Sequence, residues 1–328
     1  MTLEKYSAQQ FEIFFDQIFD NKIENDSIKD FLLEINSHDL PINSLFGAVN
    51  SLKKRMIKIP HHQDALDVCG TGGDKLKTLN ISTAVAIILA CGGIKIAKHG
   101  NRAVSSASGS ADIFTHLGIA FDDNIKNIDN NLRQHNLSFL FAPFFHPALK
   151  NVAEIRKSIN EPTIFNYIGP LLNPTNPRMQ IVGTSRQDVM RKIAEVLLKN
   201  NPAGSFYIVH GFDGMDEITL SDNSYLLKIS HQKINEMEII NPENYGINKC
   251  KIDEIIGGNP EYNSQKMLEL FAGKTSKYLD IVVLNCAFAL QLINKFQNIN
   301  DGIIFSRNLI KSGKVSKFLS EIKNNFIL

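Results

Sequence analysis

Residues 65–98 read ALDVCGTGGDKLKTLNISTAVAIILACGGIKIAK, and this stretch is the clearest indication of the fold. Residues 65–69 are typical of a short buried strand that runs into a glycine turn. Residues 82–91 have the pattern of an apolar helix, and residues 93–97 predict a second buried strand that ends at Lys98. A strand, a loop, a helix and a second strand make a βαβ unit with parallel strands. We therefore predict an α/β protein with a mainly parallel central sheet and polar residues at the carboxyl ends of its strands.

Three segments in and after this unit are rich in small residues and hydrogen-bond donors, namely residues 70–74, 80–83 and 98–112. Glycine lets the backbone approach a ligand closely, and the exposed N–H groups of such turns and of helix N-termini bind anions. Lys98 adds a positive charge, and an uncompensated ammonium at the end of a buried strand is costly. Together the segments predict a site for a small molecule that carries several phosphate groups.

The same segments also have simpler interpretations. The glycine loop at 70–74 differs from the dinucleotide-binding fingerprint and from a P-loop, and a plain tight turn is its alternative. Residues 80–83 open a helix, so a routine N-cap is the alternative there. Because three polar side chains precede the apolar run, we favour contact of Ser82 and Thr83 with a ligand or a metal. We interpret His99 as a packing or hydrogen-bonding histidine rather than as a catalyst.

An acidic pair and an arginine complete the candidate site. Asp216 and Glu217 follow a predicted strand at 206–210 and its glycine turn, and their alternative is a solvated surface pair. Beside a phosphate site they become candidates for Mg²⁺, which prefers one or two carboxylates together with substrate phosphates. Arg156 lies in a predicted helix between two prolines. It is either a surface cation or a guanidinium that binds a ligand carboxylate through two parallel hydrogen bonds.

Composition narrows the class of protein. The chain has 328 residues, 43% hydrophobic and 21% charged, and its net charge of +1 creates no global field for nucleic acid or an anionic membrane. The apolar segment 81–93 is too short to span a bilayer, and the first residues lack the pattern of a signal peptide. The four cysteines are too widely spaced to predict a disulfide framework or a zinc site. We expect a cytoplasmic protein with reduced thiols and without a nucleic-acid or membrane partner.

Residues 1–60 are predicted to form helices. The first helix carries an apolar stripe at Phe11, Phe14, Phe15, Ile18 and Phe19. Asp26 or Ser27 is a candidate cap for a second helix, and Pro41 suits the first turn of a third. These helices carry more phenylalanine than they can bury alone, so we expect them to pack on another domain or another subunit. We interpret the proline-rich residues 143–178 as a crossover or hinge that returns to the helical domain.

Taken together, the segments resemble the motifs of anthranilate phosphoribosyltransferases. The likeness is strong from about residue 60 to residue 295 and covers the N-terminal helices by layout only. The motifs that carry it are residues 70–74 (GTGGD), 80–83 (NIST), 98–102 (KHGNR), 105–112 (SSASGSAD), 141–143 (FAP), 146–148 (HPA), 165–166 (FN), 169–174 (GPLLNP) and 210–217 (HGFDGMDE). The combination is highly specific, although no single motif would be.

The resemblance implies a fold and an activity. The fold would be a small N-terminal helical domain, residues 1–62, hinged through residues 147–178 to a larger α/β domain, residues 63–328, of the nucleoside phosphorylase and phosphoribosyltransferase type. The activity would be transfer of phosphoribose from phosphoribosyl pyrophosphate (PRPP) to the amine of anthranilate in tryptophan biosynthesis, which yields N-(5-phosphoribosyl)anthranilate and pyrophosphate. Mg²⁺ would be the cofactor, and the protein would be a homodimer joined through its N-terminal helices.

The resemblance also assigns roles to residues, position by position. The residues implied for PRPP are Gly70, Thr71, Gly72, Gly73, Asp74, Thr78, Asn80, Ser82, Thr83, Lys98, Ser106 and Ser110. The residues implied for anthranilate are Gly70, His99, Asn101, His146 and Arg156, the last near the carboxylate. The residues implied for the metal are Ser82, Asp216 and Glu217. No dedicated general acid or base is implied, and Lys98 with the bound Mg²⁺ would support the transition state.

The chain departs from the family pattern at Lys75, at residues 159–162 and at Cys69, which stands where a plain aliphatic residue is common and is a conservative change. Two other functions remain as alternatives. Lys75 replaces a usual glycine, where it would stiffen the loop or add a phosphate contact, and residues 159–162 replace a common turn. A pyrimidine nucleoside phosphorylase would share the architecture, but it should lack the segment at 80–83 and use neither Asp216 nor Glu217 for a metal. A non-catalytic relative that binds nucleic acid should show a basic groove and lost ligands.

Overall fold

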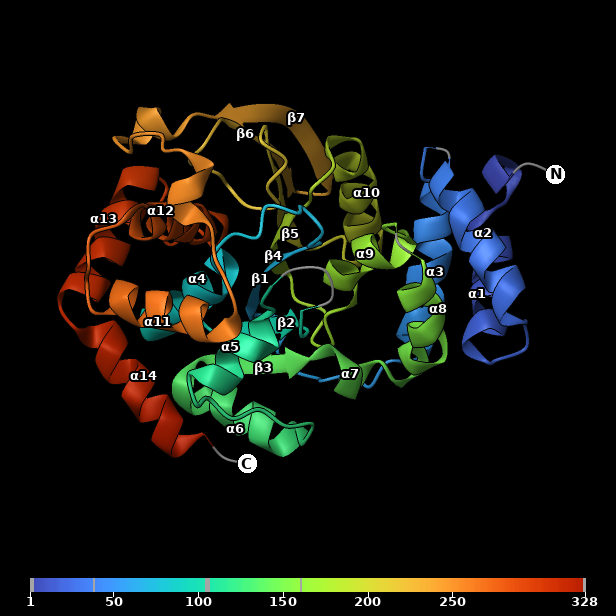
Figure 1. Ribbon diagram of the computed structural model, residues 1–328, viewed down its shortest axis with the longest axis horizontal. Coiled ribbons are helices and arrows are strands. Elements are labelled where there is room, and N and C mark those ends of the chain that lie inside the picture. The colour runs from blue at the N-terminus through green and yellow to red at the C-terminus, as the bar shows by residue number, and fades with distance from the viewer. Residues whose placement is uncertain (1–2, 38, 104–106, 160, 327–328) are drawn as a thin grey trace.

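Seven strands form one sheet in the order β3-β2-β1-β4-β5-β6-β7 in the computed structural model, which describes residues 3–37, 39–103, 107–159 and 161–326 (Figure 1). The strands are β1 (Leu66–Gly70), β2 (Ile96–Gly100), β3 (Leu137–Phe141), β4 (Met179–Gly183), β5 (Ser205–Gly211), β6 (Ser224–Ser230) and β7 (Lys233–Ile240). The strands from β3 to β5 in this order are parallel, and β6 and β7 are antiparallel. The prediction of an α/β fold with a mainly parallel sheet is confirmed.

Helices cover the sheet and form the N-terminal part of the chain. The α-helices are α1 (Ala8–Phe19), α2 (Asn25–Ser37), α3 (Ile42–Arg55), α4 (Ile81–Cys91), α5 (Ser110–His116), α6 (Ile125–His135), α7 (Ala142–Phe145), α8 (Ala153–Ser158), α9 (Ile164–Ile168), α10 (Met190–Asn200), α11 (Pro260–Phe271), α12 (Lys277–Leu292), α13 (Ile299–Lys311) and α14 (Lys314–Asn325). Short 3₁₀ helices include η2 (Pro147–Val152) and η3 (Gly169–Leu172). Within the ranges that the structure describes, no helix combines the length and the apolar character needed to cross a membrane.

The predicted βαβ unit is present as β1, α4 and β2, with one difference in its second strand. β2 begins at Ile96, later than predicted, and it ends at Gly100. Lys98 and His99 therefore lie inside the strand rather than at its end. The N–H groups of Gly93 and Ile94 donate to carbonyls in the last turn of α4, which keeps these two residues out of the sheet. The strand extends beyond Lys98 because Lys98 and His99 both pair with residues of β3.

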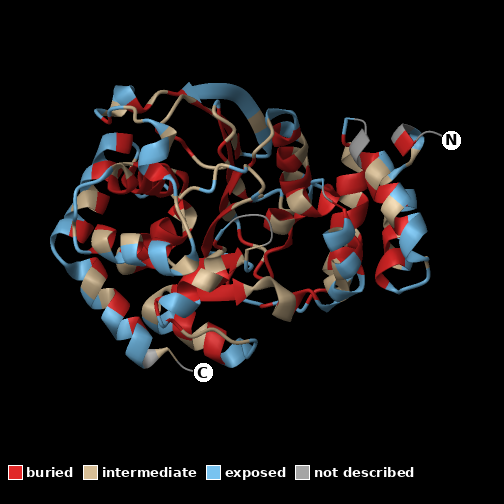
Figure 2. Cartoon of the chain, in the orientation of Figure 1, coloured by how far each residue is buried: buried red, intermediate tan, exposed pale blue. Residues whose placement is uncertain are grey.

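The two faces of the sheet bury different sets of side chains. Figure 2 shows the parallel strands as largely buried and the edge strand β7 as largely exposed. Leu66 and Val68 of β1 belong to a core that includes α4, α12 and the C-terminal helices. Cys69 belongs to a second core, which includes α1–α3, α9 and α10. Strands that are covered on both faces are typical of parallel sheets. α4 and α12 are buried on almost all sides, as their nearly continuous apolar sequences require.

The N-terminal helices pack on another part of the same chain. Figure 1 shows α1, α2 and α3 together at one side of the molecule, next to α8. The rings of Phe15 and Phe19 contact the ring of Phe165 in α9, with centroids 6.4 and 6.2 Å apart. Phe11 and Phe15 are fully buried within the chain. The surplus of phenylalanine therefore packs, at least in part, on a neighbouring region of this chain, which is one of the two predicted explanations.

The second helix starts earlier than predicted. The N–H of Ile28 donates to the carbonyl of Glu24, so the helical hydrogen bonds begin there and α2 runs from Asn25. Asp26 lies within the first turn, where a negative charge favours the helix dipole. The prediction of Asp26 or Ser27 as the cap is therefore wrong, because both residues are inside the helix.

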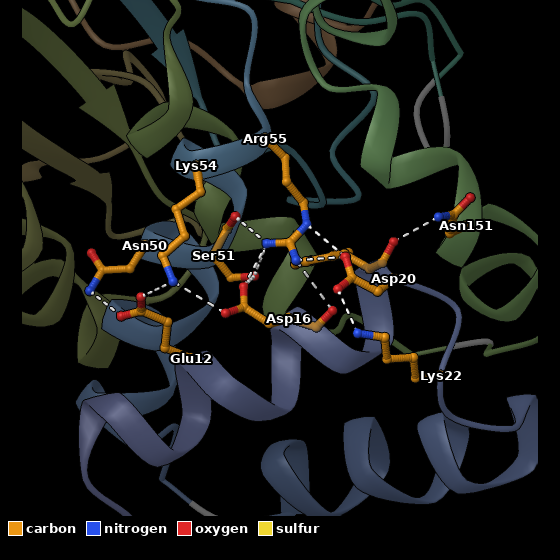
Figure 3. A network of polar contacts seen from close by, with 10 residues as sticks. Glu12, Asp16, Asp20, Lys22, Asn50, Ser51, Lys54, Arg55 and Asn151 are labelled. Atoms are coloured by element: carbon orange, nitrogen blue, oxygen red, sulfur yellow. Dashed lines mark hydrogen bonds and ion pairs between the residues drawn. The ribbon is translucent and has the colours of Figure 1, made fainter.

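A polar network joins α1 to α3 and to the segment that follows α7 (Figure 3). The guanidinium of Arg55 in α3 donates to the carboxylates of Asp16 in α1 and of Asp20, the residue that caps the end of α1. The side chain of Asn151 in η2 donates to the carbonyl of Phe19 at 2.8 Å. The network therefore links the helical part to residues that lead back toward the sheet.

Candidate functional site

A cavity of about 330 Å³ lies at the carboxyl ends of the parallel strands. The strand order reverses between β1 and β4, and loops that leave such a switch point form the usual ligand crevice of open α/β sheets. Every predicted binding residue within the described ranges lines this cavity. Ser106, which is predicted for PRPP, lies outside the described residues. The fold thus brings together segments as far apart in the sequence as Gly70 and Glu217.

The glycine loop after β1 has a backbone that glycine adopts readily and other residues adopt rarely. Gly72 and Gly73 have φ angles of +69° and +78°, in the left-handed region. The loop is tied to the end of β4 because the N–H of Thr71 donates to the carbonyl of Gly183 at 2.9 Å. The N–H of Gly72 donates to Oδ2 of Asp216 at 2.6 Å. The loop is therefore more than a tight turn, since one of its donors holds an anionic group from a distant segment.

Three carboxyl groups gather at this loop, from Asp74, Asp216 and Glu217. The carboxylate of Glu217 accepts a hydrogen bond from the N–H of Ser82, 3.1 Å away at the start of α4. Burial raises the pKa of all three carboxyl groups, and the charge of Asp216 raises the pKa of the other two further. Backbone donors of the kind that bind phosphate thus hold carboxylates of this chain. We call the segments 70–74, 80–83 and 216–217 the anion-binding part of the cavity.

These carboxyl groups fit a magnesium ion. Among the described residues, no group of three or more His, Cys, Asp or Glu side chains is arranged to hold a metal by itself. Mg²⁺, however, takes oxygen ligands and prefers one or two carboxylates together with substrate phosphates. The raised pKa values mean that the surroundings of these half-buried carboxyl groups stabilise their charge poorly, and a divalent cation would supply that stabilisation. The donor set therefore suits a magnesium ion that is shared with a phosphorylated ligand.

Asn80 occupies the N-cap position of α4, yet its side chain does not cap the helix. Its Nδ2 donates to the carbonyl of Ser108 at 3.1 Å, and its Oδ1 accepts from Nδ2 of Asn263 at 2.9 Å. The routine N-cap interpretation is therefore wrong for this side chain. Asn80 instead connects α4 to the segment that leads into α5, where Ser110 is the first helical residue.

Lys98 lines the cavity from within β2, although only 2% of it is exposed. Its Nζ donates to the carbonyl of Val68 at 2.6 Å and to the hydroxyl of Ser82 at 3.2 Å. These are its two hydrogen-bond partners within the described part of the chain, and an ammonium has three donors. The ammonium is therefore held in a fixed position with donor capacity left for an anionic ligand.

The sequence prediction did not include Asp67, a buried residue of β1 whose carboxylate connects several segments next to the cavity-lining residues. Its carboxylate accepts from Nδ2 of Asn173 at 2.9 Å, from Nε2 of Gln180 at 3.0 Å and from the N–H of His99 at 3.3 Å. Burial raises the pKa of Asp67, and the charge of Lys98 opposes that shift. A charged residue inside an apolar strand was the available signal, because a buried carboxylate needs donors.

His99 and His146 contact each other in the cavity wall, where their Nε2 atoms lie 3.2 Å apart. One ring donates this hydrogen bond and the other accepts it, so a single proton lies between the two atoms. Burial, together with the nearby His146, holds the pKa of His99 well below its usual range. Burial also lowers the pKa of His146 to about 4. Both rings are therefore neutral at pH 7, as suits hydrogen-bonding histidines.

Arg156 of α8 lines the cavity as a cation without an ion-pair partner among the described residues. Its guanidinium carbon lies 5.2 Å from the centroid of the Phe165 ring. Burial lowers its pKa. A desolvated guanidinium is costly without an anion, and its planar fork matches a carboxylate. A ligand carboxylate would complete this arrangement. We call His99, His146 and Arg156 the histidine–arginine part of the cavity.

The remaining predicted residues line the cavity with different exposure. Asn101 is exposed, and its carbonyl accepts from the hydroxyl of Ser110 at 3.4 Å. Thr83 is only 1% exposed. Thr78 forms an isolated bridge with Ile256. These contacts place the segments around residues 78, 101 and 110 at the same cavity without assigning them a role.

The lysines after the glycine loop adopt unusual backbone conformations. Lys75 and Lys77 have φ angles of +61° and +54°, which glycine adopts more easily. Both side chains are exposed, and Lys77 is a cavity-lining residue whereas Lys75 is not. Of the two consequences expected for Lys75, the geometry gives no support to a direct phosphate contact.

The fold and the cavity define the class of protein. Backbone donors, a buried lysine and clustered carboxyl groups at the ends of parallel strands are suited to phosphorylated sugars or nucleotides that react with a divalent cation. The profile of the family described as "Glycosyl transferase family, a/b domain" matches residues 62–316. This match extends over most of the chain and includes all strands of the sheet.

Two relatives of similar length share one activity in their names. Anthranilate phosphoribosyltransferase of Bacillus cereus strain B4264 is 41% identical over 285 residues, which cover 87% of this chain and 83% of the relative. The same enzyme of Petrotoga mobilis is 38% identical over 320 residues, which cover 97% of this chain and 92% of the relative. The chain therefore belongs to the anthranilate phosphoribosyltransferases, which are enzymes of the glycosyltransferase family.

Solved structures support the same assignment over nearly the whole chain. The Thermus thermophilus enzyme is 25% identical with a TM-score of 0.89, covering 98% of this chain and 96% of that chain. The Saccharomyces cerevisiae enzyme in complex with PRPP and Mg is 25% identical with a TM-score of 0.90, covering 98% and 93%. Neither the pyrimidine nucleoside phosphorylase nor the nucleic-acid-binding alternative is favoured by these relatives.

Proposed function

We propose that this chain transfers phosphoribose from PRPP to the amine of anthranilate, as a step of tryptophan biosynthesis. The names of its relatives and the yeast complex with PRPP and Mg support this activity. The observation that carries the proposal is the contrast between two parts of one cavity. Backbone donors and carboxyl groups suit a phosphorylated sugar with its cation. Neutral histidines and an uncompensated guanidinium suit an aromatic amine that bears a carboxylate.

The anion-binding part would hold PRPP, through the residues that the family resemblance implies. The N–H groups of Gly72 and Ser82 hold the carboxylates of Asp216 and Glu217. Lys98, which is already fixed by its bond to the Val68 carbonyl, has donor capacity left for the phosphates. Its charge is therefore preorganised for the leaving pyrophosphate, which is the efficient way to stabilise a transition state. Ser82, Asp216 and Glu217 would hold Mg²⁺, which supplies positive charge to that leaving group when it is bound.

The transfer exchanges one bond at the anomeric carbon of the ribose. The lone pair of the amine forms the new C–N bond, and the C–O bond to pyrophosphate breaks with its electron pair leaving on the pyrophosphate. The nitrogen, now cationic, then releases one proton to water and becomes the secondary amine of the product. An aromatic amine is neutral at pH 7, so it needs positioning more than deprotonation. We therefore assign no dedicated general acid or base. The low pKa values of His99 and His146 agree with this assignment, because weak bases would remove a proton poorly.

The histidine–arginine part would hold anthranilate, with the carboxylate on Arg156. The ring of Phe165 supports the guanidinium from one side. His99 and His146 carry no charge at pH 7, so they present ring surface and hydrogen-bonding atoms without adding to the charge of Arg156. Asn101 and Gly70 line the same cavity and complete the assigned set.

We also propose the division into a helical domain, residues 1–62, and an α/β domain, residues 63–328, with a hinge at 147–178. Arg156 and Phe165 come from the hinge segment, whereas the glycine loop comes from the sheet, and both line one cavity. A movement of the hinge would therefore change the distance between the two substrates and the access of water.

A homodimer through the N-terminal helices is a further part of this proposal. Ile13 of α1 is 52% exposed, and Phe14 and Phe46 are only partly buried at the edge of the helical core. Light scattering at micromolar concentration tests the oligomeric state, and we expect a dimer that Ile13→Asp weakens. Phe11 and Phe15 are unsuitable for this test, because they are buried within the chain and a charge there would unfold the helices. A monomeric parent protein would contradict the dimer.

Anthranilate fluorescence tests the activity directly. We expect the purified protein to consume anthranilate only when PRPP and Mg²⁺ are both present. Thymidine and uridine with inorganic phosphate, without Mg²⁺, form the control. Phosphorolysis of either nucleoside would support a pyrimidine nucleoside phosphorylase instead. Failure to consume anthranilate with PRPP and Mg²⁺ would overturn the proposal.

A further inference from the structure

Asn263 lies on α11, and its side chain is only 2% exposed behind the anion-binding part of the cavity. Its Nδ2 donates to Oδ1 of Asn80 at 2.9 Å, and its Oδ1 accepts from the N–H of Gly258 at 2.7 Å. We propose that Asn263 is a positioning residue for PRPP, which fixes the orientation of the Asn80 side chain and through it the segment at Ser108. The inference rests on the proposed function, since it names a residue that would prepare the PRPP site.

Three hydrogen bonds connect Gly258, Asn263, Asn80 and Ser108 in that order. The backbone groups of Gly258 and Ser108 determine which atom donates and which accepts in each of them. The backbone N–H of Gly258 can only donate, so the atom of Asn263 that faces it must be the oxygen. The amide nitrogen of Asn263 then faces Asn80 and requires the oxygen of Asn80 there. At the other end, the carbonyl of Ser108 can only accept, and it receives Nδ2 of Asn80 at 3.1 Å. Neither amide can turn over without losing two hydrogen bonds.

The backbone of Asn80 is held by contacts that do not involve Asn263. The hydroxyl of Tyr278 in α12 donates to the carbonyl of Asn80 at 3.0 Å. The N–H of Leu79 donates to the carbonyl of Ile255 at 3.0 Å. Loss of the Asn263 side chain would therefore leave the start of α4 in place and free only the Asn80 amide to rotate.

The segment before α11 packs closely between Asn263 and the loop that precedes Asn80. A Cβ atom on Gly257 would lie 2.7 Å from Oδ1 of Asn263 and 2.8 Å from the carbonyl of Thr78. The N–H of Gly257 donates to the carbonyl of Lys77 at 2.8 Å. This close packing leaves the Asn263 amide little room for another position.

These contacts predict an effect on one substrate only. Asn80 and Ser108 line the cavity, whereas Asn263 does not. Within the described residues, the side-chain hydrogen bonds of Asn263 lead to Gly258 and Asn80 and not to the histidine–arginine part. A change at Asn263 should therefore weaken the binding of PRPP and leave the binding of anthranilate as it was.

The test compares Asn263→Ala with Asn263→Asp. Removal of one buried hydrogen bond corresponds to about a tenfold loss of affinity, so Asn263→Ala should raise the KM for PRPP about tenfold and leave the KM for anthranilate within twofold. Asn263→Asp keeps an acceptor for Gly258 but places a carboxylate against Oδ1 of Asn80, so its KM for PRPP should rise further. If the buried carboxylate prevents folding, Asn263→Ala still decides the question.

Ser264→Ala is the matched control. Ser264 is the next residue of α11, is also buried, and its hydroxyl donates within its own helix, to the carbonyl of Pro260 at 2.7 Å. We expect this variant to keep both KM values. In an Asn80→Ala background, Asn263→Ala should change the KM for PRPP by less than twofold, because its effect passes through Asn80.

Calorimetric titration of PRPP with Mg²⁺ separates this inference from the function on which it rests. If the parent binds PRPP and both Asn263 variants bind it equally well, the inference is overturned and the proposed function stands. The inference is also overturned if Asn263→Ala raises the KM for PRPP by the same factor with and without Asn80→Ala. Equal changes of the KM values for PRPP and anthranilate in Asn263→Ala would overturn it as well. If the parent binds no PRPP, the proposed function fails and the inference fails with it.

Discussion

The two parts of the cavity differ in how the chain balances their charges. In the anion-binding part, the N–H groups of Gly72 and Ser82 already donate to the carboxylates of Asp216 and Glu217. In the histidine–arginine part, Arg156 lacks an ion-pair partner within the described residues, and the two histidines are neutral at pH 7. The first part is therefore organised by the chain itself, whereas the second depends on its ligand for charge balance.

This difference shows that one binding site can contain both anionic and cationic side chains whose charges are poorly solvated. Burial raises the pKa of Asp216 and Glu217, because their charged forms lose solvation. Burial lowers the pKa of Arg156 for the same reason, since its cation also loses solvation. Perturbed groups of this kind gather at functional sites, since a ligand of the opposite charge relieves them. A cation would stabilise the charges of Asp216 and Glu217, and a carboxylate would stabilise the charge of Arg156.

The largest expected effect tests the anion-binding part. Asp216→Asn with Glu217→Gln removes the charges that would hold Mg²⁺, and charge stabilisation by a metal is worth several kcal/mol. We expect Mg²⁺-dependent kcat/KM to fall about a thousandfold, which corresponds to about 4 kcal/mol. Fluorescence assays across a Mg²⁺ titration measure this loss.

Asp222→Asn is the control for this double variant. Asp222 lies a few residues further along the same segment, where it accepts from the N–H of Asn223 and pairs with Lys249 at 3.6 Å. We expect it to keep the activity and the magnesium dependence of the parent. An unchanged magnesium titration in the double variant would refute the assignment of Asp216 and Glu217.

The next effect tests the histidine–arginine part. Arg156→Ala removes the cation that would bind the carboxylate of anthranilate, and such a contact is worth about 2 to 4 kcal/mol on truncation. The KM for anthranilate should rise roughly 30- to 1000-fold while the affinity for PRPP changes little. Arg156→Lys should recover only part of the loss, because an ammonium lacks the planar fork.

Lys157→Ala provides the control for Arg156. Lys157 is the next residue, is exposed, and pairs with Glu154 at 2.9 Å on the surface of α8. We expect no change of either KM in this variant. A KM for anthranilate within twofold of the parent in Arg156→Ala would contradict the role of Arg156. The folding stability of Arg156→Ala should change little. The substitution removes a half-buried cation that has no ion-pair partner among the described residues, and the contact with the Phe165 ring is lost with it.

Sequence reasoning predicted the anion-binding part well because its donors lie in short, local patterns. The glycine loop, the start of α4 and the pair at 216–217 each follow a predicted strand or open a predicted helix. Carboxyl ends of parallel strands meet at one edge of a sheet, so these patterns had to converge once the fold was α/β. The predicted start of β2 was wrong. Hydrogen bonds from Gly93 and Ile94 to the end of α4, and the pairing of β2 with β3, determine where the strand begins.

The residues that sequence reasoning missed act through distant contacts. Asn263 lies 183 positions from Asn80, and its neighbours in α11 show no local motif that points to the cavity. Asp67 receives donors from three other segments, which only the folded sheet brings together. The phenylalanines of α1 predicted that this helix packs on a further domain or on another subunit. Composition alone could not distinguish a domain contact from a subunit contact, since both bury the same kind of surface.

A smaller effect concerns the neutral histidines and depends on pH. The pKa of His146 is about 4 in the folded protein and near 6.5 in an unfolded chain, so the unfolded state binds more protons between these values. Stability is therefore full above pH 6.5 and decreases as the pH falls toward 4, by about 2 kcal/mol between pH 7 and pH 5 from this residue. Urea unfolding of His146→Gln should show a shallower dependence on pH.

His231→Gln is the control for this measurement. His231 is exposed in the turn between β6 and β7, far from the His99–His146 pair in the sequence. Its replacement should leave the pH dependence of unfolding as it is in the parent. If His146→Gln also keeps the parent's dependence, then His146 is not held neutral by burial, and the description of the histidine–arginine part must change.

The smallest effect contrasts Arg156 with Arg55, whose charge is balanced inside the chain. Arg55 donates to Asp16 and Asp20 at the junction of α1 and α3 (Figure 3). The side chains of Arg55 and Asp16 are partly exposed, so this pair contributes only about 1 kcal/mol to stability. Arg55→Met should lower the free energy of unfolding by about that amount and leave both KM values unchanged. Lys22→Met, which removes a more exposed pair with Asp20, should change the unfolding curve less. The contrary outcome is a shift in the KM for anthranilate in Arg55→Met without one in Lys22→Met. It would mean that the network affects the cavity through Asn151 and the segment that carries Arg156. The distinction between the two arginines would then fail.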